Sequence, residues 1–138
     1  MTNLIISTNV NSSIIAGQHI SQIDDSIIAN KQVKFFGKEV LRLVSLGTNI
    51  SPELLLHHSR CKSYVSDARQ LAMYLLHVCM GRSMSEVGRF FGRDRTTVSH
   101  ACNRIEDRRD DVEFDEFIAK IEYELDLMIE KYDAGLWK

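Results

Sequence analysis

The most constraining feature of the sequence is the stretch Ser83–Arg109, which reads SMSEVGRFFGRDRTTVSHACNRIEDRR. In its second half, apolar residues recur at the three- and four-residue steps that mark the buried face of a helix. These residues are Val98, Ala101, Cys102 and Ile105. Gly92 before them suits a tight turn, and Asp94 suits the N-cap of the helix. The stretch therefore predicts two short helices joined by a turn.

The first helix of the pair has a start signal of its own. Ser83 and Glu86 have the spacing of a capping box. Val87, Phe90 and Phe91 are its expected packing residues, and Gly88 is expected to let another helix approach closely. Two such helices, with basic and hydroxyl residues at the tip of the second, are typical of a helix-turn-helix reader of the DNA major groove.

Apolar periodicity predicts further helices in the rest of the chain, which gives an all-α fold class. Gly47 is expected to stop the first of them in the left-handed conformation, and Ser51 with Pro52 is expected to start the second. The third is apolar around most of its circumference and is expected to be the central core helix. The expected ranges are Lys31–Leu46, Pro52 to about His57, Val65–Met80 and Glu113–Tyr132.

The sequence predicts three segments. Residues 1–30 are rich in Asn, Ser and Ile, and we expect a poorly ordered arm, although isoleucine pairs could also dock on another surface. Residues 31–110 form the helix-turn-helix domain, and residues 111–138 form an acidic amphipathic C-terminal helix.

Charge is distributed unevenly along the chain, whose net charge is −2. Residues 60–109 carry ten Lys and Arg against five acids, whereas residues 110–138 carry ten acids against three lysines. The middle of the chain is therefore a candidate for binding a polyanion. For the acidic helix we favour a solvated face with its apolar stripe on the core. A DNA mimic, a shield for the basic face and a homodimer seam are the alternatives.

Several other classes of protein are disfavoured. No apolar run is long enough to span a membrane, and the first 30 residues lack the basic start of a signal peptide. The three cysteines are expected to be reduced thiols in a cytoplasmic protein. His77 with Cys79, and His100 with Cys102, stand two residues apart on predicted helices, so neither pair can chelate a metal alone. We expect no catalytic site, no metal and no cofactor.

The stretch from Tyr64 to Glu106 resembles the C-terminal DNA-binding domain of the bacterial replication initiator DnaA, and the resemblance extends more weakly to about Val33. The matching pieces are Arg69-Gln70-x-Ala72-Met73-Tyr74-Leu75, Ser83-x-x-Glu86-Val87-Gly88-x-x-Phe91-Gly92 and Arg93-Asp94-x-Thr96-Thr97-Val98-x-His100-Ala101-Cys102-x-x-Ile105-Glu106. The resemblance implies a Trp-repressor-like helix-turn-helix bundle, to which this chain adds the C-terminal helix.

The resemblance also implies roles for individual residues on double-stranded DNA. The implied base readers in the major groove are Arg93, Asp94, Arg95, Thr96 and Thr97. The implied phosphate contacts are Arg69, His77, Arg82, Ser83, Met84, Ser85, His100 and Arg104. Arg60 and Lys62 would enter the adjacent minor groove. From the residue types alone, the outward face of the second helix could also be an ordinary solvated surface.

Three departures from the family bear on specificity. Arg95 stands where the family usually has His, and only Gly92 precedes Arg93, where the family has two glycines. The phosphate-binding motif GxxxxGK[ST] does not occur in the sequence, so we expect no nucleotide to bind. These departures leave open whether the preferred site is the initiator's box.

The predicted function is sequence-specific binding of double-stranded DNA by a transcriptional regulator that is not an enzyme. One alternative is a replication-linked modulator that competes at DnaA boxes. The other is a helix-turn-helix-derived protein–protein adaptor that does not bind DNA. Arg93 to Thr97 discriminate between these classes, because an adaptor has no reason to keep them outward and basic.

Overall fold

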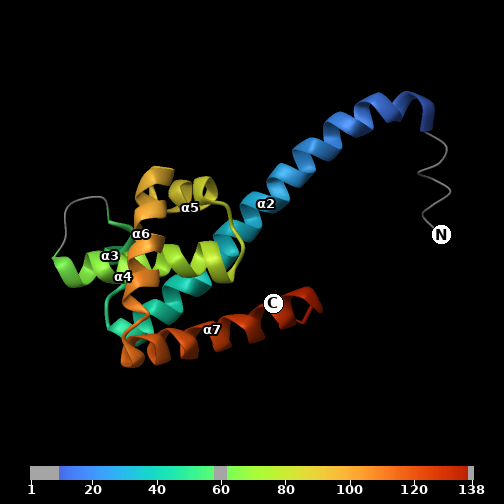
Figure 1. The fold of residues 1–138 in the computed structure, drawn as a ribbon. Coiled ribbons are helices and arrows are strands. Elements are labelled where there is room, and N and C mark those ends of the chain that lie inside the picture. Colours follow the sequence, from blue (N-terminus) through green and yellow to red (C-terminus); the bar gives the residue numbers. More distant parts are fainter. Residues whose placement is uncertain (1–9, 58–61, 137–138) are drawn as a thin grey trace. The chain divides into compact units, whose positions relative to one another are not determined.

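A computed structural model describes residues 10–57 and 62–136, with side chains from residue 27 onward. In these residues every regular element is a helix, so the expected all-α class is confirmed (Figure 1). The chain divides into two compact units, Met1–Gln32 and Val33–Lys138, and each is described by itself. Within the described ranges, no helix is both long and apolar enough to cross a membrane.

Helix α2 covers Val10–Thr48, so the predicted start at Lys31 is wrong. Asn and Ser have weak helix preferences, but each residue added to an existing helix gains a backbone hydrogen bond. Residues 10–30 contain no proline to interrupt that growth. Helical structure therefore extends through most of the segment predicted as an arm. Residues 1–9 lie outside the described residues, and poor order of the arm stays a prediction.

The end of α2 lies one residue beyond Gly47, and the left-handed residue is Asn49, with φ 60°. The expectation for Gly47 is therefore wrong, because asparagine tolerates this conformation nearly as well. Gly47 has a different use: the ring of Phe117 lies 2.9 Å from where a β-carbon would be. The glycine thus makes room for an aromatic ring from the C-terminal helix.

The central core helix is present, but it changes its winding. Helix α3 (Pro52–Leu56) is capped by Ser51 as predicted, and α4 (Ser63–Tyr74) follows. The predicted α-helix then continues as a π-helical turn, η1 (Leu75–Cys79), in which Met80 N–H donates to the Leu75 carbonyl at 3.1 Å. A run of consecutive buried residues across this junction confirms its place in the core: Leu71, Ala72, Met73, Tyr74, Leu75 and Leu76.

The predicted helix pair is formed by α5 (Met84–Phe91) and α6 (Arg95–Arg108). The capping box is present, since Ser83 Oγ accepts from Glu86 N–H and Glu86 Oε1 accepts from Ser83 N–H. The expected buried face of α6 is also confirmed: Val98, Ala101, Cys102 and Ile105. α4 and α5 both contact α6, which fixes the second helix of the pair on the core.

The C-terminal helix α7 (Val112–Asp133) buries its apolar stripe on the core, as favoured from the sequence. The fully or nearly buried positions are Ile118, Ile121, Leu125 and Met128. At its start, Arg109 donates to Asp115 and Glu122 on α7, and to the hydroxyl of Tyr74. The guanidinium of Arg108 lies 3.9 Å from the centre of the Phe114 ring. A homodimer seam on this helix stays a prediction.

Candidate nucleic-acid interface

The N-terminal tip of α6 exposes the residues predicted to read bases. Arg95, Thr96 and Thr97 occupy its first turn and are all exposed. Asp94 is the N-cap, and its Oδ1 accepts from Thr97 N–H at 2.8 Å. This backbone hydrogen bond lowers the pKa of the Asp94 carboxyl, with help from the Thr97 hydroxyl. The tip therefore combines an ionised cap with a cation and two hydroxyls beside the free N–H groups of a helix start.

A compact turn between α5 and α6 sets the orientation of this tip. Gly92 ends α5 in the left-handed conformation, with φ 66°, and Arg93 N–H donates to the Gly88 carbonyl at 2.8 Å. A β-carbon on Gly88 would lie 2.6 Å from the carbonyl oxygen of Arg93. The close approach expected at Gly88 is therefore real, but the turn itself makes it rather than another helix.

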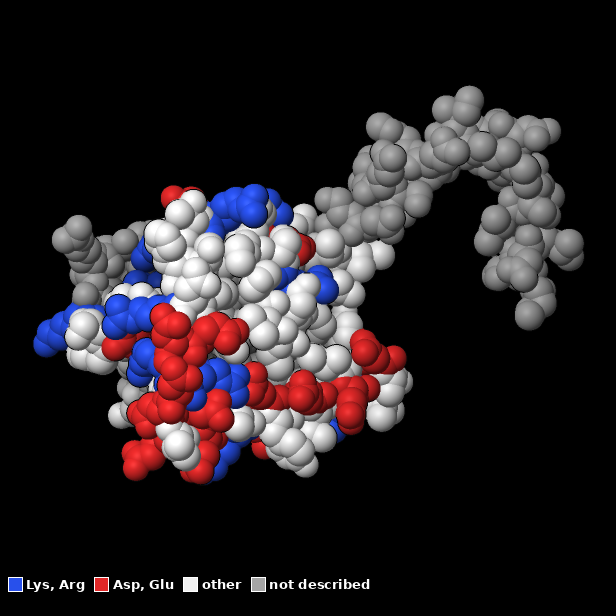
Figure 2. All heavy atoms as spheres, in the orientation of Figure 1, with Lys and Arg blue, Asp and Glu red and all other residues white. Residues whose placement is uncertain are grey.

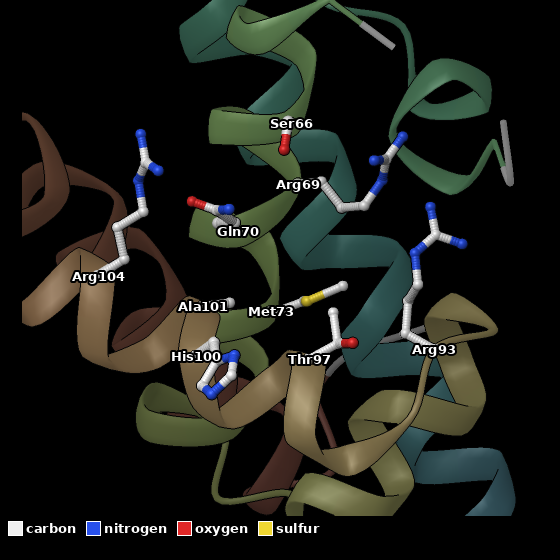
Figure 3. Close-up of a pocket in the computed structure, with 9 residues that line it drawn as sticks. All are labelled: Ser66, Arg69, Gln70, Met73, Arg93, Thr97, His100, Ala101 and Arg104. Atoms are coloured by element: carbon white, nitrogen blue, oxygen red, sulfur yellow. The ribbon is translucent and has the colours of Figure 1, made fainter. Parts of the chain in front are cut away.

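A hollow of about 320 Å³ lies beside the tip, where α4 faces α6. Figure 3 shows the residues of α4 on one side of it and those of α6 and the preceding turn on the other. Five predicted DNA-contacting residues line it: Arg69, Arg93, Thr97, His100 and Arg104. The structure thus brings together residues that are far apart in the sequence.

Two residues of α4 that the sequence analysis did not assign also belong to this hollow. Ser66 and Gln70 line it, and Gln70 Oε1 is buried without a hydrogen-bond partner. Ser66, Gln70 and Met73 follow one another at steps of four and three residues, which could have indicated a shared helix face with Arg69 beside it. At the rim, Arg104 forms an ion pair with Asp67 of α4 at 3.2 Å.

Arg69 faces the protein interior. Its side chain is 7% exposed, and its guanidinium donates to three backbone carbonyls at the end of α3: Leu54 at 3.1 Å, Leu55 at 2.7 Å and His57 at 3.1 Å. The last carbonyls of a helix lack α-helical partners, and Arg69 supplies donors to this helix end. A phosphate contact by Arg69 stays a prediction.

A second group of predicted phosphate contacts lies where η1 leads into α5. His77 Nδ1 is 2.7 Å from the Arg82 carbonyl, and the Arg82 guanidinium lies 5.6 Å from the centre of the Phe36 ring. Ser83 and Ser85 are exposed at the start of α5, while Met84 is half-buried. None of these residues lines the hollow, so the predicted phosphate contacts fall into two separate places on the described surface.

Of the two predicted minor-groove residues, Lys62 is the exposed N-cap of α4, and Arg60 lies outside the described residues. Lys62 has no side-chain capping bond, and its carbonyl accepts from Val65 and Ser66. Its side chain is thus not required by the start of the helix.

Comparison with known proteins identifies this part of the chain. The sequence profile described as the bacterial DnaA protein helix-turn-helix matches residues 38–105. Residues 38–105 form a DnaA-type helix-turn-helix domain. The chromosomal replication initiator protein DnaA of Brucella abortus is 45% identical over 71 residues, which are 51% of this chain and 14% of that protein. DnaA of Deinococcus deserti is 35% identical over 80 residues, or 58% and 17% of the two chains.

The chain thus matches about one seventh of the length of the DnaA proteins from Brucella abortus and Mesorhizobium japonicum. The matched part contains α3, α4, η1, α5 and nearly all of α6. The helix α7 lies beyond it. The DnaA-type domain therefore holds all the predicted site residues, and the acidic helix is an addition to it.

Charge is segregated around the DnaA-type domain. On the face that Figure 2 draws, acidic side chains follow α7 and surround the turn from α6, while basic side chains lie near α5 at the top, at the left and also among the acidic side chains lower down. The basic excess is smaller than the sequence suggested, because Arg109 already pairs with Asp115 and Glu122.

The two cysteines of the described part, Cys79 and Cys102, have raised pKa values. Burial raises the pKa of Cys79 to about 12, with Asp126 as the next cause, and raises the pKa of Cys102 to about 11. A raised pKa keeps the thiol protonated and unreactive at neutral pH. Across residues 10–57 and 62–136, no three His, Cys, Asp or Glu side chains gather closely enough to hold a metal ion.

Proposed function

We propose that the protein binds double-stranded DNA in a sequence-specific way and acts as a transcriptional regulator. The observation that carries this proposal is the tip of α6, where Arg95, Thr96 and Thr97 are exposed while the face behind them is buried. Arginine commonly reads guanine through two hydrogen bonds, and threonine can contact the thymine methyl group. An ionised Asp94 can accept from cytosine N4.

Phosphate contacts would hold this tip in the major groove. Donors for such contacts are exposed on both helices, Ser83 and Ser85 at the start of α5 and His100 and Arg104 along α6. Arg104 would exchange Asp67 for a phosphate oxygen, since its present ion pair is exposed and costs little to break. Such contacts position the protein and make its affinity depend on salt.

The experiment is selection from randomised duplex DNA with the purified protein, followed by affinity measurements on the enriched site. Arg95→Ala should cost about 1–3 kcal/mol on that site and relax preference at one base pair. Arg104→Ala should weaken binding to all sequences alike and lower the salt slope by about one unit. Arg42→Ala serves as the matched control, because Arg42 is an exposed arginine of α2, outside the proposed interface, that pairs with Glu39.

A replication-linked role is the second candidate, favoured by the 45% identity with DnaA from Brucella abortus. Enrichment of the initiator's box would support competition with DnaA, whereas a different motif would support a separate set of target genes. Arg95 and the single Gly92 are the features expected to shift the motif. A library without any enriched sequence at moderate salt would overturn both roles and favour a protein–protein adaptor.

A further inference from the structure

Two arginines from different elements donate to the same backbone carbonyl. The His57 carbonyl accepts from Arg69 of α4 and from Arg93 of the turn before α6, each at 3.1 Å. Figure 3 shows both side chains reaching the same side of the hollow. The carbonyl belongs to the C-cap of α3, where the backbone is extended, with φ −67° and ψ 140°. The end of α3 is thus tied both to the core and to the turn of the helix pair.

The two bonds differ in what they connect. Arg69 is buried and holds three carbonyls of α3, so its contribution is to the fold itself. Arg93 is half-buried, immediately precedes the cap residue Asp94, and its bond spans 36 residues of sequence. The Arg93 bond therefore links the end of α3 to the first residues of the recognition tip.

We propose that Arg93 is a positioning residue that sets the distance between two DNA-contacting parts of the interface. One part is the tip from Asp94 to Thr97. The other begins at Lys62, which is five residues after His57 and starts α4. A guanidinium that already donates to a backbone carbonyl has fewer N–H groups left for a guanine. The remaining tip residues therefore read the bases. This assignment rests on the proposed function and replaces base reading as the role of Arg93.

The binding test measures affinities in a double-mutant cycle of Arg93→Ala and Lys62→Ala. The duplex is the one enriched by selection with the unmodified protein. Arg93→Ala should reduce affinity about tenfold, because a charge-assisted hydrogen bond that aligns the two parts is lost. The loss should be smaller when Lys62→Ala is already present, because without the Lys62 contact there is less benefit from aligning the two parts of the interface. Repeated selection with Arg93→Ala should return the same preferred sequence.

Arg95→Ala is the matched control, since Arg95 lies two residues away and is exposed in the first turn of α6. It should change the preferred base at one position and show no coupling to Lys62→Ala. Arg93→Lys, which keeps a cationic donor, should recover part of the affinity. A changed base preference with Arg93→Ala, or additive losses with Lys62→Ala, would overturn the positioning role.

A second measurement does not depend on DNA. In the free protein, the amide of His57, which donates to the Leu54 carbonyl, should exchange with solvent several-fold faster in Arg93→Ala than in the unmodified protein. Amides of α4 provide the reference for overall stability, and Arg95→Ala should leave the ratio unchanged. If no DNA sequence is enriched, the proposed function fails, and this exchange still decides whether Arg93 ties the end of α3 to the turn: equal ratios would refute that tie.

Discussion

The guanidinium of Arg109 and the carboxylate of Glu122 form a two-point ion pair with both N–O distances at 3.0 Å. Arg109 closes α6, and Glu122 lies in the middle of α7, so the pair joins the helix-turn-helix to the acidic helix. The hydrogen bonds that Arg109 donates to Glu122 are the largest cause of its raised pKa. Both side chains are largely shielded from water, with 21% and 26% exposed.

Replacing Arg109 with methionine should lower the free energy of unfolding by about 2 kcal/mol, because it leaves a shielded carboxylate without its donor. Urea unfolding followed by circular dichroism measures the change. Arg104→Met removes a more exposed ion pair, with Asp67, and should change stability by at most about 0.5 kcal/mol. Equal effects of the two substitutions would show that the Arg109 contact does not anchor α7.

Gly37 should not tolerate alanine, although alanine normally favours a helix. A β-carbon there would lie 2.3 Å from the tip of the Phe90 ring, so the ring or the helix must shift. We expect a loss of about 1–3 kcal/mol in unfolding free energy. Adding Phe90→Leu, which removes the obstructing ring, should make the Gly37→Ala change less costly. If the cost were the same with leucine at position 90, the clash would not be its cause.

Substituting Asp94 should distinguish its role as a helix cap from its role in reading bases. Its lowered folded-state pKa means that the cap stabilises the fold above the unfolded-state pKa, and that this contribution disappears as pH falls through the lower folded-state value. Asp94→Asn keeps a capping oxygen without titrating. The difference in melting temperature between the two proteins should therefore change between pH 7 and pH 3. In DNA selection the same substitution should alter the preferred base near the tip.

Cys79 should be nearly inert toward iodoacetamide at pH 8. With the pKa raised from 9.0 to about 12, its thiolate fraction is roughly a thousandfold below that of a model thiol. Because the folded pKa exceeds the unfolded one, the thiol favours the folded state at neutral pH, and this contribution declines as pH rises from about 9. Mass spectrometry of labelled peptides measures the rate. Rapid labelling of native protein would contradict the buried setting.

The helix-turn-helix could be predicted closely because its signals are local. The capping box at Ser83, the cap at Asp94 and the turn at Gly92 each depend on residues within four positions. The buried face of α6 follows from periodicity alone. At these positions the conformation that the local residues favour is also the one that tertiary packing requires, so the local sequence predicts the folded structure.

The predictions that were wrong depended on choices between similar local options. Gly47 and Asn49 both suit a left-handed helix end, and packing of Phe117 against Gly47 accompanies the choice of Asn49. The start of α2 depended on helix propagation, which composition resolves poorly. No local sequence pattern predicted the π-helical turn at Leu75–Cys79.

The candidate site shows the same division. Exposure of Arg95 to Thr97 could be predicted from the buried stripe of α6. The hydrogen bonds that engage Arg69 and Arg93 could not, because they join residues 12 to 36 positions apart through backbone carbonyls that carry no sequence signal. Sequence could indicate that these arginines matter, but only the folded chain indicates which way their guanidinium groups point.

The separation of charge between the middle of the chain and α7 has a consequence for how the protein would meet a nucleic acid. Residues 60–109 have an excess of five positive charges, and residues 110–138 an excess of seven negative charges. Such a distribution is an electric dipole, and the field of a polyanion exerts a torque on it before contact. A chain with a pI of about 6.2 would then approach DNA in one orientation, with the acidic helix turned away.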